Sequence, residues 1–299
     1  MPTSVLNVKT HKDIRRYIVE KTSIEKIQIF KKPFTAVLTD AVSLSLSKQK
    51  TNITEIIENE NTHQVDSNRF SKNKDNVFTL YSKQIENIIK KIENTKNFNL
   101  KECDYALGIV TGNNSKHIFN TAVFGSLPIY TGKEIQKYCL SMPKKYIMYQ
   151  RDFFQQVAKD EYYFAVEKLI YKFISNKRLI FAYDANKSLI LNSANLLIPK
   201  NTPIDIKGLC VLLNSNVLNF YFKNKVNQIK TLKADLQNLP IPLVSPILEK
   251  KLIEFFNKKE FEKDSEIQEL IYSHYGFSDN EIKIIEDDLK YGKIKRNFE

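Results

Sequence analysis

The fold that we expect for this chain follows from the stretch Leu107-Gly108-Ile109-Val110-Thr111-Gly112-Asn113-Asn114-Ser115-Lys116-His117-Ile118. Its apolar start predicts a strand, which runs into a polar turn and out again into a second strand. Glycine adopts positive φ without steric cost, and asparagine tolerates the same region. The turn would present the candidate binding residues Thr111, Gly112, Asn113, Asn114, Lys116 and His117. Their polar groups suit a phosphate or a base edge, and a plain solvated hairpin is the alternative.

Five further blocks follow this stretch in a fixed order. They are Leu127-Pro128-Ile129-Tyr130-Thr131-Gly132-Lys133-Glu134-Ile135, Lys168-Leu169-Ile170, Phe181-Ala182-Tyr183-Asp184, Leu212-Leu213-Asn214-Ser215 and Leu239-Pro240-Ile241-Pro242. In order and content they resemble the TaqI-like C-terminal specificity domain, the target-recognition domain of type II and type IIG DNA adenine-N6 methyltransferases. Each block is weak alone, but the ordered set over roughly 135 residues is fairly specific.

The resemblance implies an α+β fold, with a mixed α/β target-recognition domain over residues 101–245. A partial α/β remnant of a Rossmann-like methyltransferase domain would precede it in residues 1–50. A connecting segment with an amphipathic helix would occupy residues 51–100, and a helical tail residues 246–299. Within the recognition domain, Lys116 and Lys133 would contact phosphate or guanine, and Asn113, Asn114 and Asn186 would contact bases or backbone.

Residues 1–50 carry two patterns similar to the end of such a catalytic domain, Pro2-Thr3-Ser4-Val5-Leu6 and Arg15-Arg16-Tyr17. The family's catalytic Asn/Asp-Pro-Pro-Tyr/Phe motif is absent, and no Gly-x-Gly occurs. We therefore assign no catalytic and no cofactor-binding residue. By resemblance, S-adenosylmethionine belongs to the complete enzyme, and a separate catalytic subunit or an upstream half would be a partner. A small α/β cap unrelated to a methyltransferase is the alternative for this segment.

Three local patterns predict further elements. Residues 59–76 are polar and predict a surface loop, whereas Ile85, Ile88, Ile89 and Ile92 lie at helical spacing. Residues 209–223 predict one amphipathic helix. The helices of the tail are acidic, which favours a role in supporting the domain or contacting a partner over a role in DNA contact.

The net charge of +12 is unevenly distributed over the 299 residues. Residues 101–245 hold 19 basic and 10 acidic residues, whereas residues 246–299 hold 10 and 13. A basic middle with an acidic tail indicates a face suited to a polyanion, and duplex DNA is the obvious partner. A lysine-rich composition that serves solubility alone would give the same excess.

Other classes of function find little support in the sequence. The three cysteines are far apart and the four histidines are scattered, so that no metal motif is predicted. No apolar run reaches membrane-spanning length, and a cytoplasmic location is expected. A restriction endonuclease subunit, with a metal site assembled from distant residues, stays open as an alternative. An RNA-binding or scaffolding protein also stays open.

Overall fold

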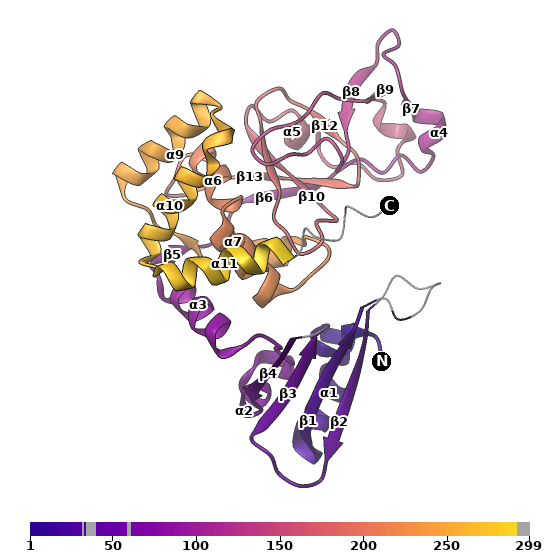
Figure 1. The fold of residues 1–299 in the computed structure, drawn as a ribbon. Coiled ribbons are helices and arrows are strands. Elements are labelled where there is room, and N and C mark those ends of the chain that lie inside the picture. Colours follow the sequence, from indigo (N-terminus) through magenta and orange to yellow (C-terminus); the bar gives the residue numbers. More distant parts are fainter. Residues whose placement is uncertain (32, 34–39, 59–60, 292–299) are drawn as a thin grey trace. The chain divides into compact units, whose positions relative to one another are not determined.

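The computed structural model describes residues 1–31, 33, 40–58 and 61–291, and the chain forms two compact units, Met1–Ile88 and Ile89–Glu299. Each unit combines helices with small sheets (Figure 1). The expectation of an α+β fold is therefore confirmed. Among the described residues, no helix is both long enough and apolar enough to cross a membrane.

The first unit is built on a four-stranded sheet with the order β2-β1-β3-β4. Strand β1 pairs antiparallel with β2 and parallel with β3, which pairs antiparallel with β4. Apolar side chains of these strands, including Ile27 and Ile56, form the core together with Phe70. The elements are η1 (Thr3–Leu6), η2 (Lys9–His11), α1 (Lys12–Lys21), β1 (Ser23–Phe30), β2 (Ala41–Ser47), β3 (Ile53–Glu58), β4 (Asn61–Asp66), α2 (Asn68–Lys72) and η3 (Lys74–Asn76).

The surface loop predicted for residues 59–76 is wrong for the described part of that range. Strand β4 and helix α2 occupy most of it, while Asn59 and Glu60 lie outside the described residues. The polar sequence misleads because β4 is an edge strand with one fully buried side chain, Val65. Strands β3 and β4 thus join β1 and β2 in one sheet, so that residues 51–66 are part of the first unit and not a connection.

Arg15 ties the N-terminal segment of this unit to α1. Its side chain is fully buried and donates hydrogen bonds to the carbonyl oxygens of Val5 (3.0 Å), Val8 (2.9 Å) and Asp75 (3.0 Å). Burial lowers the pKa of the guanidinium, which nevertheless stays far above neutrality. The Arg15-Arg16-Tyr17 pattern therefore includes a packing residue.

The predicted amphipathic helix is present as α3 (Lys83–Asn94), with Ile88, Ile89 and Ile92 buried. The boundary between the two compact units falls within it. The structure thus divides the chain inside this helix, in place of the boundaries at residues 50 and 100 that the sequence favours.

The second unit holds two four-stranded sheets, β11-β10-β13-β6 and β12-β8-β9-β7, and a short β14-β5 pair. All strand pairs are antiparallel except β12 and β8. One apolar cluster, with Ile109, Ile170 and Ile190 near its centre, includes residues of both large sheets. The strands are β5 (Asn97–Phe98), β6 (Asp104–Leu107), β7 (Ile118–Phe119), β8 (Leu127–Tyr130), β9 (Lys145–Ile147), β10 (Lys168–Lys172), β11 (Phe181–Asp184), β12 (Leu189–Ile190), β13 (Ala194–Ile198) and β14 (Ile241–Pro242).

Residues 107–118 pass from one large sheet to the other. Strand β6 belongs to the first sheet and β7 to the second, so the two strands do not form the plain hairpin that was the alternative for this stretch. The crossing requires glycine at position 108, where a Cβ atom would lie 2.1 Å from the carbonyl oxygen of Leu191. The amide groups of Gly108 and Ile109 donate to the carbonyls of Ala194 (3.1 Å) and Ile190 (2.7 Å), which lock the crossover.

Most of the longer helices form the other part of this unit, and in Figure 1 α6, α7, α9, α10 and α11 lie away from α4, β7, β8 and β9. The helical elements are α4 (Asn114–His117), η4 (Arg151–Phe153), α5 (Asp160–Tyr163), α6 (Ile206–Leu213), α7 (Asn216–Tyr221), a π-helical turn η5 (Phe222–Val226), α8 (Lys233–Gln237), α9 (Pro246–Lys258), η6 (Phe261–Lys263), α10 (Asp264–Tyr275) and α11 (Asp279–Tyr291). The helical tail predicted for the C-terminal segment is therefore present.

The single helix predicted for residues 209–223 is wrong, because the chain breaks between α6 and α7. Asn214 accepts a hydrogen bond from the amide of Phe181 (3.0 Å) and donates one to its carbonyl (2.9 Å). These bonds satisfy the backbone hydrogen-bonding groups of Phe181 in β11. The Ser215 hydroxyl then caps α7 by accepting from the amide of Leu218. Both side chains are buried, as are the apolar residues on all sides of these helices, so the segment is not amphipathic.

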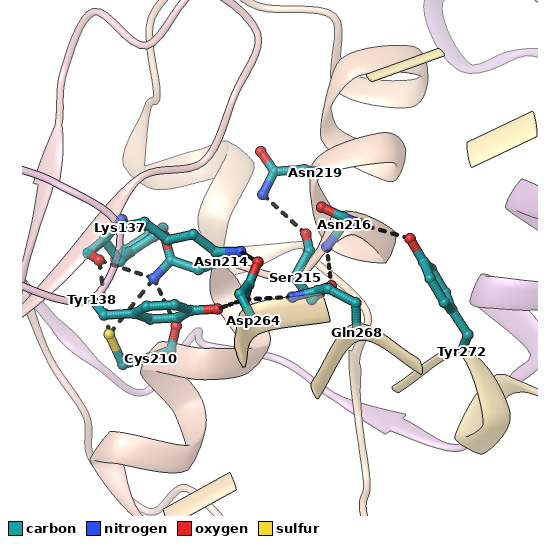
Figure 2. Close-up of polar contacts among 11 residues, drawn as sticks. Lys137, Tyr138, Cys210, Asn214, Ser215, Asn216, Asn219, Asp264, Gln268 and Tyr272 are labelled. Carbon is teal, nitrogen blue, oxygen red and sulfur yellow. Dashed lines mark hydrogen bonds and ion pairs between the residues drawn. The ribbon is translucent and has the colours of Figure 1, made fainter. Parts of the chain in front are cut away.

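A polar network joins α10 to the sheet-bearing part of the unit (Figure 2). Asp264 accepts hydrogen bonds from the hydroxyl of Tyr138 and from Gln268 (3.1 Å), and it pairs with Lys137 at 2.5 Å. Gln268 in turn accepts from the amide of Asn216 at 2.7 Å. Burial, and then the neighbouring Asp264, raise the pKa of Tyr138, so its hydroxyl stays a proton donor. The tail thus packs on the domain through hydrogen-bonded groups.

A fully buried ion pair, the deepest among the described residues, joins the two strands β10 and β11. Lys168 and Asp184 face each other in register, their side chains are fully buried, and Nζ lies 2.6 Å from Oδ2. Burial lowers the pKa of Lys168. Burial alone would raise the pKa of Asp184, but the Lys168 ammonium and the hydrogen bonds from Ser188 outweigh it, and this pKa is lowered. The lowered pKa of Asp184 thus favours its carboxylate, which faces Lys168 in this pair.

Removing Asp184 should destabilise the second unit strongly. The Asp184→Ala variant leaves the Lys168 ammonium buried without its partner, and the free energy of unfolding should fall by about 3–5 kcal/mol at neutral pH. Because the pKa of Asp184 is lowered, its contribution is present at neutral pH and is lost as the pH falls through that pKa. Denaturant melts of both proteins between neutral and acidic pH measure this difference.

The double variant Lys168→Met/Asp184→Leu is the control, because it leaves no buried charge unpaired. It should lose less stability than Asp184→Ala. Equal losses in the two variants would show that the destabilisation comes from packing and hydrogen bonds alone.

Candidate nucleic-acid interface

The turn predicted at residues 111–114 is a compact, hydrogen-bonded structure. Gly112 has φ +77°, as expected from the sequence. The Thr111 hydroxyl donates to Oδ1 of Asn114 at 2.6 Å, and Oδ1 of Asn113 accepts from the amide of Lys116 at 3.2 Å, which caps the single turn α4. Thr111 is buried, whereas Gly112, Asn113, Asn114 and Lys116 are exposed. Thr111 and the Asn113 carboxamide oxygen therefore shape the turn, and Lys116 is the cation that it presents.

His117 ends α4 against two phenylalanines. Its ring stacks on Phe153 at 6.4 Å between centroids and meets the edge of Phe154 at 5.8 Å. It is half-buried, so one side of the imidazole is covered by protein. His117 thus joins α4 to residues 148–155.

Arg151 fixes the conformation of residues 148–155 through its hydrogen bonds. Its guanidinium donates to the carboxylate of Asp160 and to the carbonyl of Ala158 at 2.8 Å. Hydrogen bonds from Tyr149 and Arg151 lower the pKa of Asp160, which therefore remains charged at neutral pH. Arg151 is thereby a positioning group, although its side chain is partly exposed.

The strand register places the α4 turn and the last residues of the β7–β8 connection at the same end of the strands of the second sheet. Ile147 of β9 lies opposite both Ile118 and Leu127. Residues 114–117 and 123–126, which come just before these two residues, therefore leave the sheet at the same end. Two strand spacings, about 10 Å, separate their exits. We call residues 112–117, 123–126 and 148–155 the α4 edge.

The other two predicted residues lie apart from the α4 turn. Because β12 and β8 are parallel, Lys133, which follows β8, and Asn186, which precedes β12, leave opposite ends of this strand pair. Asn186 precedes β12 at the same end of the strands as the α4 edge. However, β12 and β7 are the two outer strands of the sheet, so three strand spacings, about 14 Å, separate them. The structure thus gathers residues 111–117 and separates Lys133 and Asn186 from them.

Both separated residues are exposed on turns that buried groups organise. Glu134 accepts from the amide (2.8 Å) and the hydroxyl (2.6 Å) of Thr131, which shapes the turn carrying Lys133. Asp184 accepts from the amides of Asn186 (3.2 Å) and Ser188 (3.0 Å), which shapes the other turn. Contacts of Lys133, Asn186 and the exposed residues of the α4 turn with DNA stay predictions.

Sequence reasoning missed most of the α4 edge. Residues 123–126 and 148–155 carry no periodic pattern and no motif, and only the strand register brings them beside α4. One signal was available. Between residues 105 and 151 the chain has six lysines and arginines and a single carboxylate, Glu134, which is buried.

Within the described part of the chain, no group of three or more histidine, cysteine, aspartate or glutamate side chains is arranged to hold a metal ion. The three cysteines are free, two of them buried. We therefore assign no metal ligand among the described residues of this site.

The model of the TaqI-like C-terminal specificity domain family matches residues 127–241, which include β8 to β13 and both turns just described. These residues form a TaqI-like C-terminal specificity domain. The family resemblance inferred from the ordered blocks is thus confirmed. The specificity domain includes Lys133 and Asn186, whereas the α4 turn lies just before it.

A curated relative supports the same assignment. The type II methyltransferase M.VspI of Vibrio sp. (strain 343) is 26% identical over 136 residues, which cover 44% of this chain and 33% of the relative. The chain thus spans about a third of the length of that methyltransferase. Together these matches support a TaqI-like specificity domain that is similar to part of a type II methyltransferase.

Solved structures share the fold. The type IIL restriction-modification enzyme MmeI in complex with DNA matches with a TM-score of 0.59 at 11% identity, over 94% of this chain and 47% of that chain. The type IIG restriction endonuclease BpuSI matches with a TM-score of 0.44 at 12% identity, over 86% of this chain and 41% of that chain. At these identities only the likeness to MmeI bears on the fold, and neither bears on activity.

Lys116→Ala should leave the stability of the chain nearly unchanged. Its side chain is exposed and makes no core contact, so the free energy of unfolding should change by less than about 0.5 kcal/mol. Gly112→Val is the opposite case, because a β-branched residue is strained at φ +77°. Denaturant melts of the two variants should therefore differ clearly. A marked loss in Lys116→Ala would assign this lysine to the structure of the turn.

Proposed function

We propose that this chain reads a DNA sequence for a site-specific adenine-N6 methyltransferase of a restriction-modification system. The specificity domain would bind duplex DNA, and a catalytic half would transfer a methyl group from S-adenosylmethionine to N6 of adenine. The observation that carries the proposal is the specificity-domain match over residues 127–241. The relative M.VspI, itself named a type II methyltransferase, supports the reaction class.

The charges of the second unit support a polyanion as ligand. The excess of basic residues lies in residues 101–245, while the helical tail is acidic. Lysine and arginine that neutralise phosphates release condensed counterions, which supplies affinity independent of sequence. Exposed Lys116 at the α4 edge and exposed Lys133 on its turn would contribute such contacts. Asn113, Asn114 and Asn186 would contact base edges or backbone, since asparagine suits adenine.

Binding of duplex DNA should weaken steeply as salt rises. For about four to six neutralised phosphates, the slope of log K against log salt should be about −4 to −5. If Lys116 contacts phosphate, Lys116→Ala should weaken all sequences alike and reduce this slope by about one. If it reads guanine, the loss should be about 1–3 kcal/mol on the cognate site alone. Titration of a labelled duplex at several salt concentrations separates these results, and an affinity indifferent to salt would contradict the proposal.

The chain by itself should neither bind S-adenosylmethionine nor methylate DNA, because it contains neither the cofactor loop nor the catalytic motif of the family. Isothermal calorimetry and transfer of labelled methyl groups test this. Micromolar binding of the cofactor would show that the chain forms a cofactor site of another kind. Methylation that appears only after a separate catalytic half is added would support division of labour between the two, with residues 1–50 as the docking segment.

A further inference from the structure

The connection between β7 and β8 ends in a hydrogen-bonded turn with a phenylalanine near its apex. Residues 123–126 form the turn, in which the amide of Ser126 donates to the carbonyl of Val123 at 3.0 Å. The third residue, Gly125, has φ +75°, the conformation that type II turns require at this position. The Ser126 hydroxyl closes the turn again, donating to the carbonyl of Val123 (2.7 Å) and accepting from its amide (3.0 Å). Phe124 is thus fixed at the second position of the turn.

The side chain of Phe124 has no protein to pack against. Its exposed fraction is 103%, the highest among the exposed large apolar residues that the structure describes. Its neighbours Val123 and Leu127 are 41% and 40% exposed, so the turn itself rests on the unit while the ring projects from it. Covering such an exposed aromatic ring with a flat apolar partner is favourable, because it removes a large apolar surface from water.

We propose that Phe124 is a wedge that inserts between the stacked bases of bound DNA; this inference rests on the proposed function. Apolar side chains that enter a base step unstack it and bend the duplex. The turn fixes the backbone of Phe124, so that insertion costs mainly the rotamer freedom of one side chain with two χ angles.

The position of the turn suits this role. Residues 123–126 leave the sheet at the α4 edge, beside the segment that carries Lys116, since Ile147 pairs with both Ile118 and Leu127. A Cβ atom at Gly125 would lie 3.5 Å from Met148, which places the turn against residues 148–155. A cation and an aromatic ring on one edge match the alternation of phosphates and bases in a nucleic acid.

The local charges favour nucleic acid over a protein as the partner of Phe124. Residues 105–151 contain six basic residues and one carboxylate, and that carboxylate, Glu134, is buried. Of these six, Lys137 pairs with Asp264 and Arg151 with Asp160, so the positive excess of the segment comes from Lys116, Lys133, Lys144 and Lys145. Such a field attracts a polyanion and brings its bases within reach of the ring.

Two duplexes of about 30 base pairs test the wedge with the full chain. They have the same mixed sequence, except that one carries a central mismatch. Opening a mismatched step costs less than opening a paired one, so a wedge binds the mismatched duplex more tightly. Wild type should prefer it by about fivefold or more, as a stacking contribution of about 1 kcal/mol or more implies. Fluorescence anisotropy at low salt measures both affinities.

The variants isolate the ring. Phe124→Ala should lose the preference for the mismatch while keeping the salt slope, because the ring neutralises no phosphate. Phe124→Trp should keep the preference. Val166→Ala is the matched control, since Val166 is also strongly exposed (73%) but lies outside residues 105–151, and it should behave as wild type. The ratio of two affinities within one protein does not depend on the fraction that is folded.

Each outcome decides one question. If wild type binds neither duplex, the proposed function and the wedge both fail. If wild type binds both duplexes equally, or Phe124→Ala keeps the preference, the wedge alone fails and DNA binding stands. Loss of the preference in Phe124→Ala, with its retention in Phe124→Trp and Val166→Ala, supports the wedge.

Discussion

The buried ion pair between Lys168 and Asp184 is the constraint on which the specificity domain depends. Two charges that are fully removed from water are stable only when each satisfies the other and its remaining hydrogen-bonding groups. Lys168 therefore also donates to the carbonyl of Tyr163 (2.7 Å), and Asp184 also accepts from the hydroxyl of Ser188 (2.7 Å). These contacts fix the start of β10, the end of β11 and the turn between β11 and β12 together. An exposed turn thus takes its conformation from a group that solvent never reaches.

The same division between buried and exposed groups recurs at the other turns. Glu134 shapes the turn that carries Lys133, and Thr111 shapes the turn that carries Lys116. In each case a buried polar side chain sets the backbone, and a neighbouring exposed residue is left to interact with a ligand. Exposed residues on such turns can change with little effect on folding, because they contribute little to the core.

Local motifs in the sequence predicted the family and one turn, whereas features set by contacts between distant residues could not be predicted. The ordered blocks identified the family, and the glycine at position 112 correctly predicted a positive φ in the turn. Periodicity predicted one helix over residues 209–223, but hydrogen bonds between Asn214 and distant Phe181 break it. The polar sequence of β4 predicted a loop, since an edge strand needs few apolar residues. The α4 edge was out of reach, because Ile147 brings Ile118 and Leu127 together only through strand register.

The contact between Tyr138 and Asp264 has a consequence for the order in which the domain is made. The two residues are 126 positions apart, and Asp264 lies beyond the segment that matches the specificity domain. During synthesis, Tyr138 and Lys137 leave the ribosome long before α10 exists. Their network is therefore completed only after α10 has emerged. A nascent chain of this protein carries an unfinished polar surface until translation has passed α10.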